Sequence, residues 1–266
     1  MTPVTVTRGD GPLVLGFPHV GTHVPEAIRD RLNAEGRLLR DTDWHVDTLY
    51  DGLIPGATTV RANFHRYVID ANRDPSGASL YPGQTTTGLV PLITFDNVPI
   101  WREGMEPAPE DVAERLAAFH APYHAALSEE LARVKARHGF AILYDCHSIR
   151  SVVPWLFPGT LPDFNIGTND GASCAPALAQ AVHHVASCAS AYTSVLNGRF
   201  KGGWTTRHYG RPADHVHAIQ MELTQSSHLT TEAPPFALDP AKAQRLRRWL
   251  QEILEALIDL SEEMTR

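Results

Sequence analysis

Leu143-Tyr144-Asp145-Cys146-His147-Ser148 is the stretch around which the rest of the chain is organised. An apolar run over 140–143 stops at Asp145, His147 and Ser148. This pattern is typical of a buried strand that carries polar side chains to its carboxyl end, where α/β sheets bind ligands. His147 is therefore a candidate metal ligand or catalytic base, and the alternative is a structural histidine with an ordinary hydrogen bond.

The composition limits the class of protein. The chain has 266 residues, 43% of them hydrophobic, and no interdomain linker, so we expect one domain spanning 1–266. A net charge of −7 without a basic stripe argues against nucleic-acid binding. No apolar run has signal-peptide or membrane-spanning length, so we expect a cytoplasmic protein without a membrane partner. Three cysteines without a CxxC pair argue against a disulfide scaffold, and the oligomeric state is left open.

The periodicity of apolar residues predicts alternating strands and helices. Strands are expected at 12–17, 57–62, 64–70, 140–144, 192–196 and 217–223. Helices are expected at 25–39, through Leu49 and Tyr50, at 110–138 with a kink at Pro122, from the cap Ser173 to 187, and at 240–263 after the cap Asp239. The segment 77–107 lacks periodicity, and we expect a lid or a binding loop there. The fold class is α/β, with a site at the strand ends.

Candidate metal ligands follow two of the strands. Pro18-His19-Val20-Gly21-Thr22-His23 comes after the first strand, where Gly21 permits a tight turn and His19 is a better candidate ligand than His23. A hard anionic ligand is expected beside a histidine pair. The segment Asp41-Thr42-Asp43-Trp44-His45-Val46-Asp47 is the nearest dense source of carboxylates. Helix capping is the alternative role for these acids.

Candidate substrate-binding groups lie further along the chain. Asp70-Ala71-Asn72-Arg73 follows an expected strand that contains Arg66, and Arg73 can bind a carboxylate or an oxyanion. A structural ion pair of Arg73 with Asp70 or Asp74 is the alternative. The Gly-rich segment 197–210 carries Lys201 and Arg207, which suits an anionic small molecule, or else forms a mobile surface loop. Glu222, among apolar neighbours in the last strand, is expected to have a raised pKa that suits a general base.

Together these parts describe a zinc hydrolase with three protein ligands, an activated water, a glutamate base and an arginine for the oxyanion. An alternative of another class is a non-catalytic protein that binds an acidic amino acid through its Arg and Lys loops. A Cys146 thiol nucleophile paired with His147 is disfavoured, because adjacent strand residues point to opposite faces.

The chain also resembles the N-formylglutamate amidohydrolase family, which is similar to zinc carboxypeptidases and aspartoacylases. The resemblance runs from Pro18-His19-Val20-Gly21 through Asp41-Thr42-Asp43-Trp44-His45, Arg66–Arg73, Asp145–Ser148 and Asn197–Gly203 to Gln220-Met221-Glu222-Leu223. It implies a three-layer, zinc-exopeptidase-like sandwich with a mixed central sheet flanked by helices on both faces. It also implies hydrolysis of N-formyl-L-glutamate to formate and L-glutamate, at the close of histidine degradation.

The resemblance further implies the roles of individual residues. His19 and His147 look like the zinc histidines, Asn72-Arg73 like the pair that holds a substrate carboxylate, and Glu222 like the general base. The carboxypeptidase pattern would need a glutamate at position 22, where this chain has Thr22. The third ligand of the expected divalent metal, which we take to be zinc, is therefore assigned to Asp43 in preference to Asp47. Arg73, with Arg66, Arg207 or Lys201, is expected to hold the two carboxylates of a small acidic substrate. Another N-acyl amino acid or a peptide is the alternative substrate on this scaffold.

Overall fold

Seven strands form one mixed sheet in the computed structural model, which describes residues 1–79, 83 and 85–264. The order across the sheet is β1-β3-β2-β4-β7-β5-β6. The strands are β1 (Val4–Thr7), β2 (Leu13–Phe17), β3 (Thr58–Ala62), β4 (Ala141–Ile149), β5 (Phe164–Gly167), β6 (Ser194–Leu196) and β7 (Val216–Thr224). The predicted α/β fold with a mixed sheet is confirmed.

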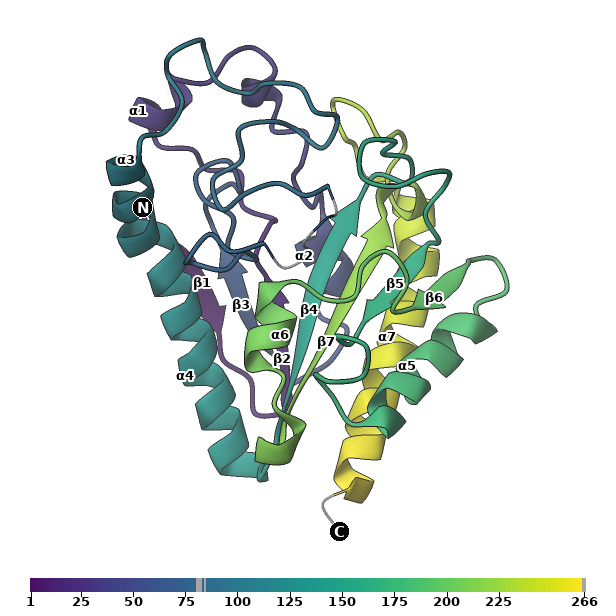
Figure 1. Ribbon diagram of the computed structural model, residues 1–266. Helices are drawn as coiled ribbons and strands as arrows, with labels where there is room; N and C mark the ends of the chain where they lie inside the picture. Colours follow the sequence, from purple (N-terminus) through teal and green to yellow (C-terminus); the bar gives the residue numbers. More distant parts are fainter. Residues whose placement is uncertain (80–82, 84, 265–266) are drawn as a thin grey trace.

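Four central strands, β3, β2, β4 and β7, run parallel to one another. Strands β1 and β5 are antiparallel to β3 and β7. Every residue of β2, β4 and β7 is buried, which explains why these strands read as apolar runs in the sequence. The carboxyl ends of the parallel strands meet at one edge of the sheet, where long loops gather (Figure 1).

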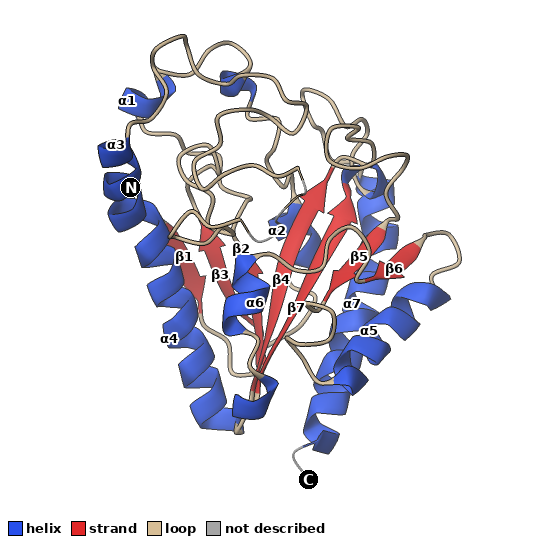
Figure 2. Cartoon of the chain, in the orientation of Figure 1, coloured by secondary structure: helices blue, strands red, loops and turns tan. Residues whose placement is uncertain are grey.

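Helices cover both faces of the sheet (Figures 1 and 2). Helices α2 (Val46–Tyr50), α5 (Pro176–Cys188) and α7 (Pro240–Met264) pack on one face, against Ile142, Tyr144 and Met221. Helices α4 (Ala121–His138) and α6 (Trp204–Tyr209) lie over the other face, where Leu143 and Ala218 are buried. The predicted three-layer arrangement follows from these two apolar clusters.

The expected helix at 110–138 forms with a break in its middle. It consists of α3 (Pro109–Arg115), a π-helical turn η2 (Leu116–His120) and α4. Pro122 lacks a backbone N–H, so the helical hydrogen-bond ladder is interrupted near the point where the kink was predicted. Gly139 ends α4 in the left-handed conformation with a φ of 81°. The carboxylate of Asp239 accepts hydrogen bonds from the Ala241 and Lys242 amides and so caps α7 as predicted.

One strand prediction was wrong, and two strands were missed. The segment 64–70 is not a strand but a series of turns, in which Val68 N–H donates to His65 O and Asp70 N–H to Leu89 O. Its apolar residues are fully buried, so burial and not strand pairing explains its composition. The edge strand β1 and the short strand β5 were not predicted, because their residues do not form long apolar runs.

The helix predictions were wrong in three places. The segment 25–39 holds only α1 (Glu26–Arg29) and the 3₁₀ turn η1 (Gly36–Leu38), because Leu32 forms a β-bridge with Trp101. Ser173 does not cap α5, since its hydroxyl donates to Ala218 O. Helix α6 lies within the segment that was expected to be a loop.

The loops at the carboxyl edge include most of the segment 77–107, which is irregular as predicted (Figure 2). Residues 80–82 and 84 of that segment lie outside the described residues. The remaining 3₁₀ turns are η3 (Pro212–Asp214) and η4 (Gln225–Ser227). No helix in the described part of the chain is long and apolar enough to cross a membrane.

Gly21→Ala is expected to lower the free energy of unfolding by about 1–3 kcal/mol. The reason is close packing, because a Cβ at Gly21 would lie 2.5 Å from the Asn63 carbonyl carbon and 2.5 Å from Phe64 O. Gly16→Ala is the matched control, since its Cβ would meet its nearest neighbour, Asp145 Oδ1, at 3.4 Å. Urea denaturation of both variants measures the difference, and equal stabilities would contradict this interpretation of Gly21.

Candidate active site

The register between β4 and β7 places two pairs of polar side chains on the same face of the sheet. His147 is paired with Glu222, and Asp145 with Gln220. Residues that alternate with them, such as Cys146 and Met221, belong to the apolar cluster under α7. Strand β4 therefore continues through the polar residues to Ile149, beyond the expected end at Tyr144. The alternation also keeps Cys146 and His147 on opposite faces, as predicted.

His19 and Asp43 reach the same place from two loops. His19 lies two residues beyond the end of β2, and its carbonyl accepts a hydrogen bond from the Asp43 amide. The two Nδ1 atoms of His19 and His147 are 3.2 Å apart. Asp43 Oδ2 lies 3.0 Å from His147 Nδ1 and 3.6 Å from His19 Nδ1. All three side chains are at most 2% exposed.

This geometry fits one bound metal ion. Two ligands held about 2.0–2.1 Å from a tetrahedral zinc ion lie about 3.3 Å apart. The three donor atoms have separations close to that value, and among the described residues they form a group that could hold a metal ion. Two imidazole nitrogens and one carboxylate oxygen are also a donor set typical of catalytic zinc sites.

Each histidine has a carboxylate behind its other ring nitrogen. His19 Nε2 lies 2.7 Å from Asp70 Oδ1, and His147 Nε2 lies 3.1 Å from Asp145 Oδ2. A carboxylate in this position accepts the Nε2 proton and leaves the Nδ1 lone pair free for a metal. Asp70 and Asp145 therefore orient both Nδ1 atoms toward Asp43.

The charges of these groups are strongly coupled. Burial alone would raise the pKa of Asp43, but the adjacent imidazoles of His147 and His19 hold that pKa well below its usual range. Burial would likewise lower the pKa of His147, but Asp145 and Asp43 raise it well above the ordinary value.

Glu222 is the acid nearest to this group on the neighbouring strand. Its side chain is buried, and its Oε2 accepts a hydrogen bond of 3.2 Å from the Gln220 amide. Burial raises the pKa of Glu222 to about 8, although the nearby positive charge of His147 opposes this rise. The prediction of a desolvated carboxylate in this strand is confirmed.

Arg66 lies between the carboxylates that surround the histidines. Its Nη2 is 2.7 Å from Asp70 Oδ2, and its Nη1 is 3.9 Å from Asp43 Oδ1. The guanidinium carbon also lies 4.8 Å from the centre of the Phe95 ring. These contacts hold one buried positive charge beside the candidate metal ligands.

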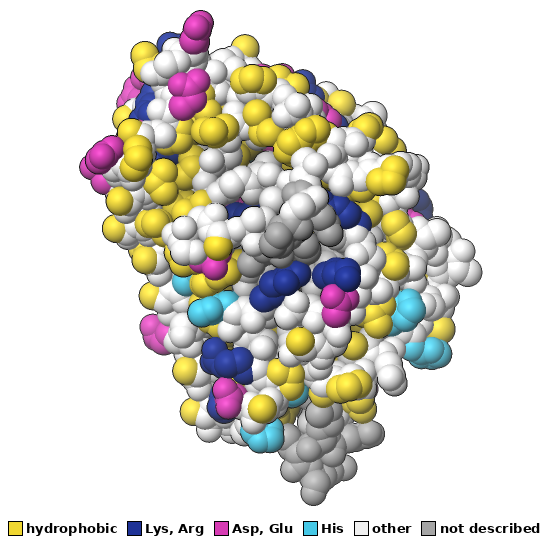
Figure 3. All heavy atoms as spheres, viewed as in Figure 1, with side chains coloured by type: hydrophobic (Ala, Val, Ile, Leu, Met, Phe, Trp, Pro, Cys, Tyr) yellow, Lys and Arg dark blue, Asp and Glu magenta, His cyan; other side chains and the backbone are white. Residues whose placement is uncertain are grey.

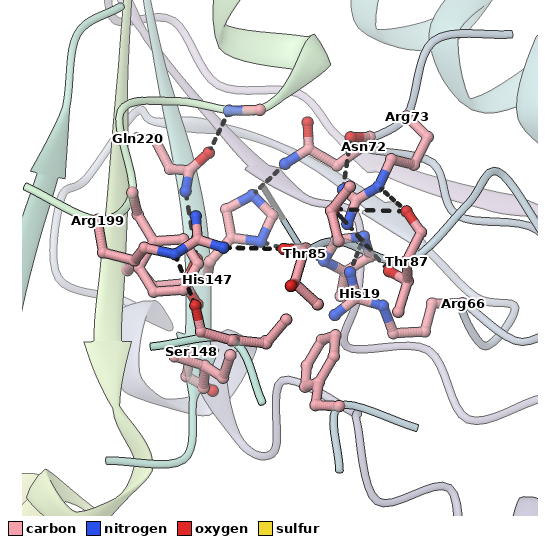
Figure 4. A pocket seen from close by; sticks show the side chains of 17 residues that line it. His19, Arg66, Asn72, Arg73, Thr85, Thr87, His147, Ser148, Arg199 and Gln220 are labelled. Carbon is pink, nitrogen blue, oxygen red and sulfur yellow. Dashed lines mark hydrogen bonds between the residues drawn. The ribbon is translucent and has the colours of Figure 1, made fainter. Parts of the chain in front are cut away.

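A pocket opens above His19 and His147 (Figure 4). Asn72 contributes to its wall, with Nδ2 located 3.1 Å from His147 Nε2 and Oδ1 accepting the Thr205 amide. Gly203 allows this close approach, because a Cβ there would lie 2.3 Å from Asn72 Nδ2. The remaining lining residues include Arg66, Arg73, Thr85, Thr86, Thr87, Phe95, Ser148, Arg199, Phe200, Gln220 and Glu222.

The structure does not bring every predicted residue into this pocket. Lys201 lies outside its lining, with Nζ 3.0 Å from Asp170. Arg207 also lies outside, where its Nε donates to Gly202 O. Asp47 is 3.2 Å from Arg61 on another part of the surface, so it does not join the histidine pair. On the face seen in Figure 3, some Lys and Arg side chains lie near the middle, at about the height of α6 in Figure 1.

Sequence reasoning gave Arg199 only a role shared with the other cations of its segment, and it gave Asp145 and Gln220 no role. Arg199 and Gln220 line the pocket, and Asp145 supports His147. Asp145 and Gln220 could have been found from strand alternation, since each is two residues from a candidate site residue in a buried strand. Arg199 could not be separated from Lys201 and Arg207, because the three cations share one irregular segment.

Known proteins resemble this chain over most of its length. The model of the N-formylglutamate amidohydrolase family matches residues 11–229. A protein of Pseudomonas aeruginosa named N-formylglutamate deformylase is 50% identical over 252 residues, which is 94% of each chain. A protein of the same name from Pseudomonas putida is 46% identical over 252 residues, again 94% of each chain.

Two solved structures have a similar fold. The N-formylglutamate amidohydrolase of Ralstonia eutropha is 28% identical, with a TM-score of 0.78 over 99% of this chain and 98% of that one. The Agrobacterium tumefaciens gene product Atu2144 is 20% identical, with a TM-score of 0.74 over 98% and 96% of the two chains, and this likeness concerns the fold alone. From the family match and the high identity over nearly its whole length, the chain belongs to the N-formylglutamate amidohydrolase family.

Proposed function

We propose that this chain is a metal-dependent amidohydrolase that cleaves N-formyl-L-glutamate to formate and L-glutamate. The observation that carries the proposal is the convergence of His19, Asp43 and His147 beside Glu222, in a pocket lined by three arginines. The names of relatives at 46–50% identity support the choice of substrate. The pocket supports it independently, because an anionic substrate is attracted by the guanidinium groups of Arg66, Arg73 and Arg199.

His19, Asp43 and His147 are proposed to hold one divalent metal, most suitably zinc. When bound, such a metal would activate a water molecule and polarise the formyl carbonyl group. The carboxylates of Asp70 and Asp145 keep both imidazole rings in the required orientation.

Glu222 is proposed to act as the general base and then as the general acid. It takes a proton from the attacking water and delivers it to the amine that leaves as L-glutamate. A carboxyl group is most effective in both roles when its pKa lies near the working pH. Burial of Glu222 between β4 and β5 moves its pKa in that direction.

Arg66 and Arg73 are proposed to have different roles. Arg66 is held against Asp70 and close to Asp43, so its charge stays beside the reacting group and can stabilise the negative charge that develops on the formyl oxygen. Arg73 extends along the pocket wall next to Asn72, and these two residues are proposed to bind the α-carboxylate. Lys201 and Arg207 are left out of this proposal because they lie outside the pocket lining.

We infer that residues 1–266 act as one catalytic domain, because the single sheet combines strands from Val4 to Thr224 and α7 packs on the same core. The family resemblance supports a place for this reaction at the close of histidine degradation, in the cytoplasm.

Asp43→Asn is expected to remove most of the bound metal, because an amide is a much weaker ligand than a carboxylate. Asp47→Asn is the matched control, since Asp47 faces Arg61 and should not affect metal content. Elemental analysis of both purified variants measures the metal-to-protein ratio. Full metal in the Asp43 variant, or its loss in the Asp47 variant, would reverse the choice of ligand.

Glu222→Gln is expected to keep its metal and to release formate from N-formyl-L-glutamate about 10²–10⁴-fold more slowly than the unchanged protein. The amide keeps the shape of the side chain but cannot accept the proton of the attacking water. The exposed Glu103→Gln is the control and should leave turnover unchanged. Unchanged formate release by the Glu222 variant, with metal content verified, would refute the assignment of the base.

A further inference from the structure

We propose that Arg199 binds the side-chain carboxylate of the substrate and thereby makes the enzyme selective for an acidic N-formyl amino acid. This inference rests on the function proposed above and names the residue that sets its substrate class. Three features carry it: the way Arg199 is held, its position relative to Arg73, and the chemistry of the groups that both arginines contact.

Arg199 is held in a defined position in the pocket wall. It follows β6 at a turn where Asn197 has a φ of 54°. The Asn197 side chain fixes this turn by bonding to the backbone amide and the hydroxyl of Thr168. The guanidinium lies 5.4 Å from the centre of the Phe200 ring, and its Nε donates to Leu156 O. An arginine held in this way loses little conformational entropy when it binds a carboxylate.

Arg73 and Arg199 lie on opposite sides of the pocket, with His147 between them in Figure 4. Arg73 lies beside the carboxylate that supports a candidate ligand, because its Nη1 is 3.7 Å from Asp70, which in turn contacts His19. Arg199 is held by backbone carbonyls of two loops. The α-carboxylate of the substrate is attached to the carbon that bears the reacting amide, whereas the side-chain carboxylate is two methylene groups further away. Arg73, next to Asp70, therefore suits the α-carboxylate, and Arg199, on the opposite wall of the pocket, suits the distant one.

The same short segment contacts both arginines in this structure. Arg199 Nη2 donates to Thr85 O at 3.0 Å. Arg73 Nε donates to Thr87 O at 2.9 Å, and its Nη2 to the Thr87 hydroxyl at 3.0 Å. These acceptors are neutral oxygens, whereas a carboxylate forms shorter and stronger bonds to a guanidinium group. A dicarboxylate can therefore replace the Thr85–Thr87 contacts at both ends, and a substrate with one carboxylate can replace them only at Arg73.

This arrangement predicts a specific pattern of selectivity. Arg199→Gln should lower kcat/KM for N-formyl-L-glutamate by on the order of 10²-fold, mainly through KM, because one charge-assisted contact is lost. It should leave kcat/KM for N-formyl-L-glutamine within about threefold, because that neutral substrate has no second carboxylate. For N-formyl-L-glutamate, kcat/KM of the Arg199→Lys variant should lie between the values of the unchanged protein and of Arg199→Gln. The reason is that lysine keeps the charge but not the forked geometry.

The experiment compares both substrates in the metal-loaded protein and measures binding of the product L-glutamate and of L-glutamine by calorimetry. Arg211→Gln is the control, since it removes the same charge from an exposed position outside the pocket lining. Equal losses for both substrates would show that Arg199 only supports the fold, and no loss for either would show that it does not contact substrate. Either result overturns the inference.

The binding measurement separates this inference from the proposed function. If the unchanged protein hydrolyses neither N-formyl amino acid, the proposed function fails. Weaker binding of L-glutamate, but not of L-glutamine, by the Arg199→Gln variant would still support the role of Arg199. Equal binding of L-glutamate by the variant and the unchanged protein would contradict it.

Discussion

The parallel pairing of β4 with β7 is the constraint on which the site depends. This register sets His147 beside Glu222 and Asp145 beside Gln220, while the intervening side chains enter the apolar core under α7. A slip of one residue would turn His147 into that core and Cys146 toward the pocket. The loop that carries His19 begins close to His147, because it follows β2, which pairs with β4 on the side opposite β7. The apolar face of the sheet thus determines the geometry of the polar one.

The site concentrates buried charge that the rest of the protein must compensate. Asp43, Asp70 and Asp145 are buried around two histidines, with Arg66 as the enclosed cation. Burying ionised groups is costly unless each is paired and hydrogen-bonded. Arg66 supplies part of the positive charge, and a divalent cation on the three ligand atoms would supply more. Metal binding and stability of the folded state are therefore expected to be linked.

Periodic features of the sequence predicted most of the fold. The central strands and the helix α7 have long apolar patterns with clear caps, and they form as expected. The segment 64–70 has the composition of a strand but forms turns. Its apolar side chains are buried by tertiary packing, without pairing to a neighbouring strand. His19 and His147 could be anticipated as candidate ligands because each lies in or just after an apolar strand, and Asp43 because it belongs to the nearest group of carboxylates. Arg199 could not, since only the loop conformation after β6 decides which cation of that segment enters the pocket.

The most direct test of this account is formate release from N-formyl-L-glutamate before and after removal of metal by a chelator, followed by the addition of zinc. Metal-dependent hydrolysis predicts formate release that the chelator abolishes and that zinc restores. Formate release that persists in protein shown by elemental analysis to contain no metal would contradict the central claim, because His19, Asp43 and His147 would then have no metal-binding role in the reaction.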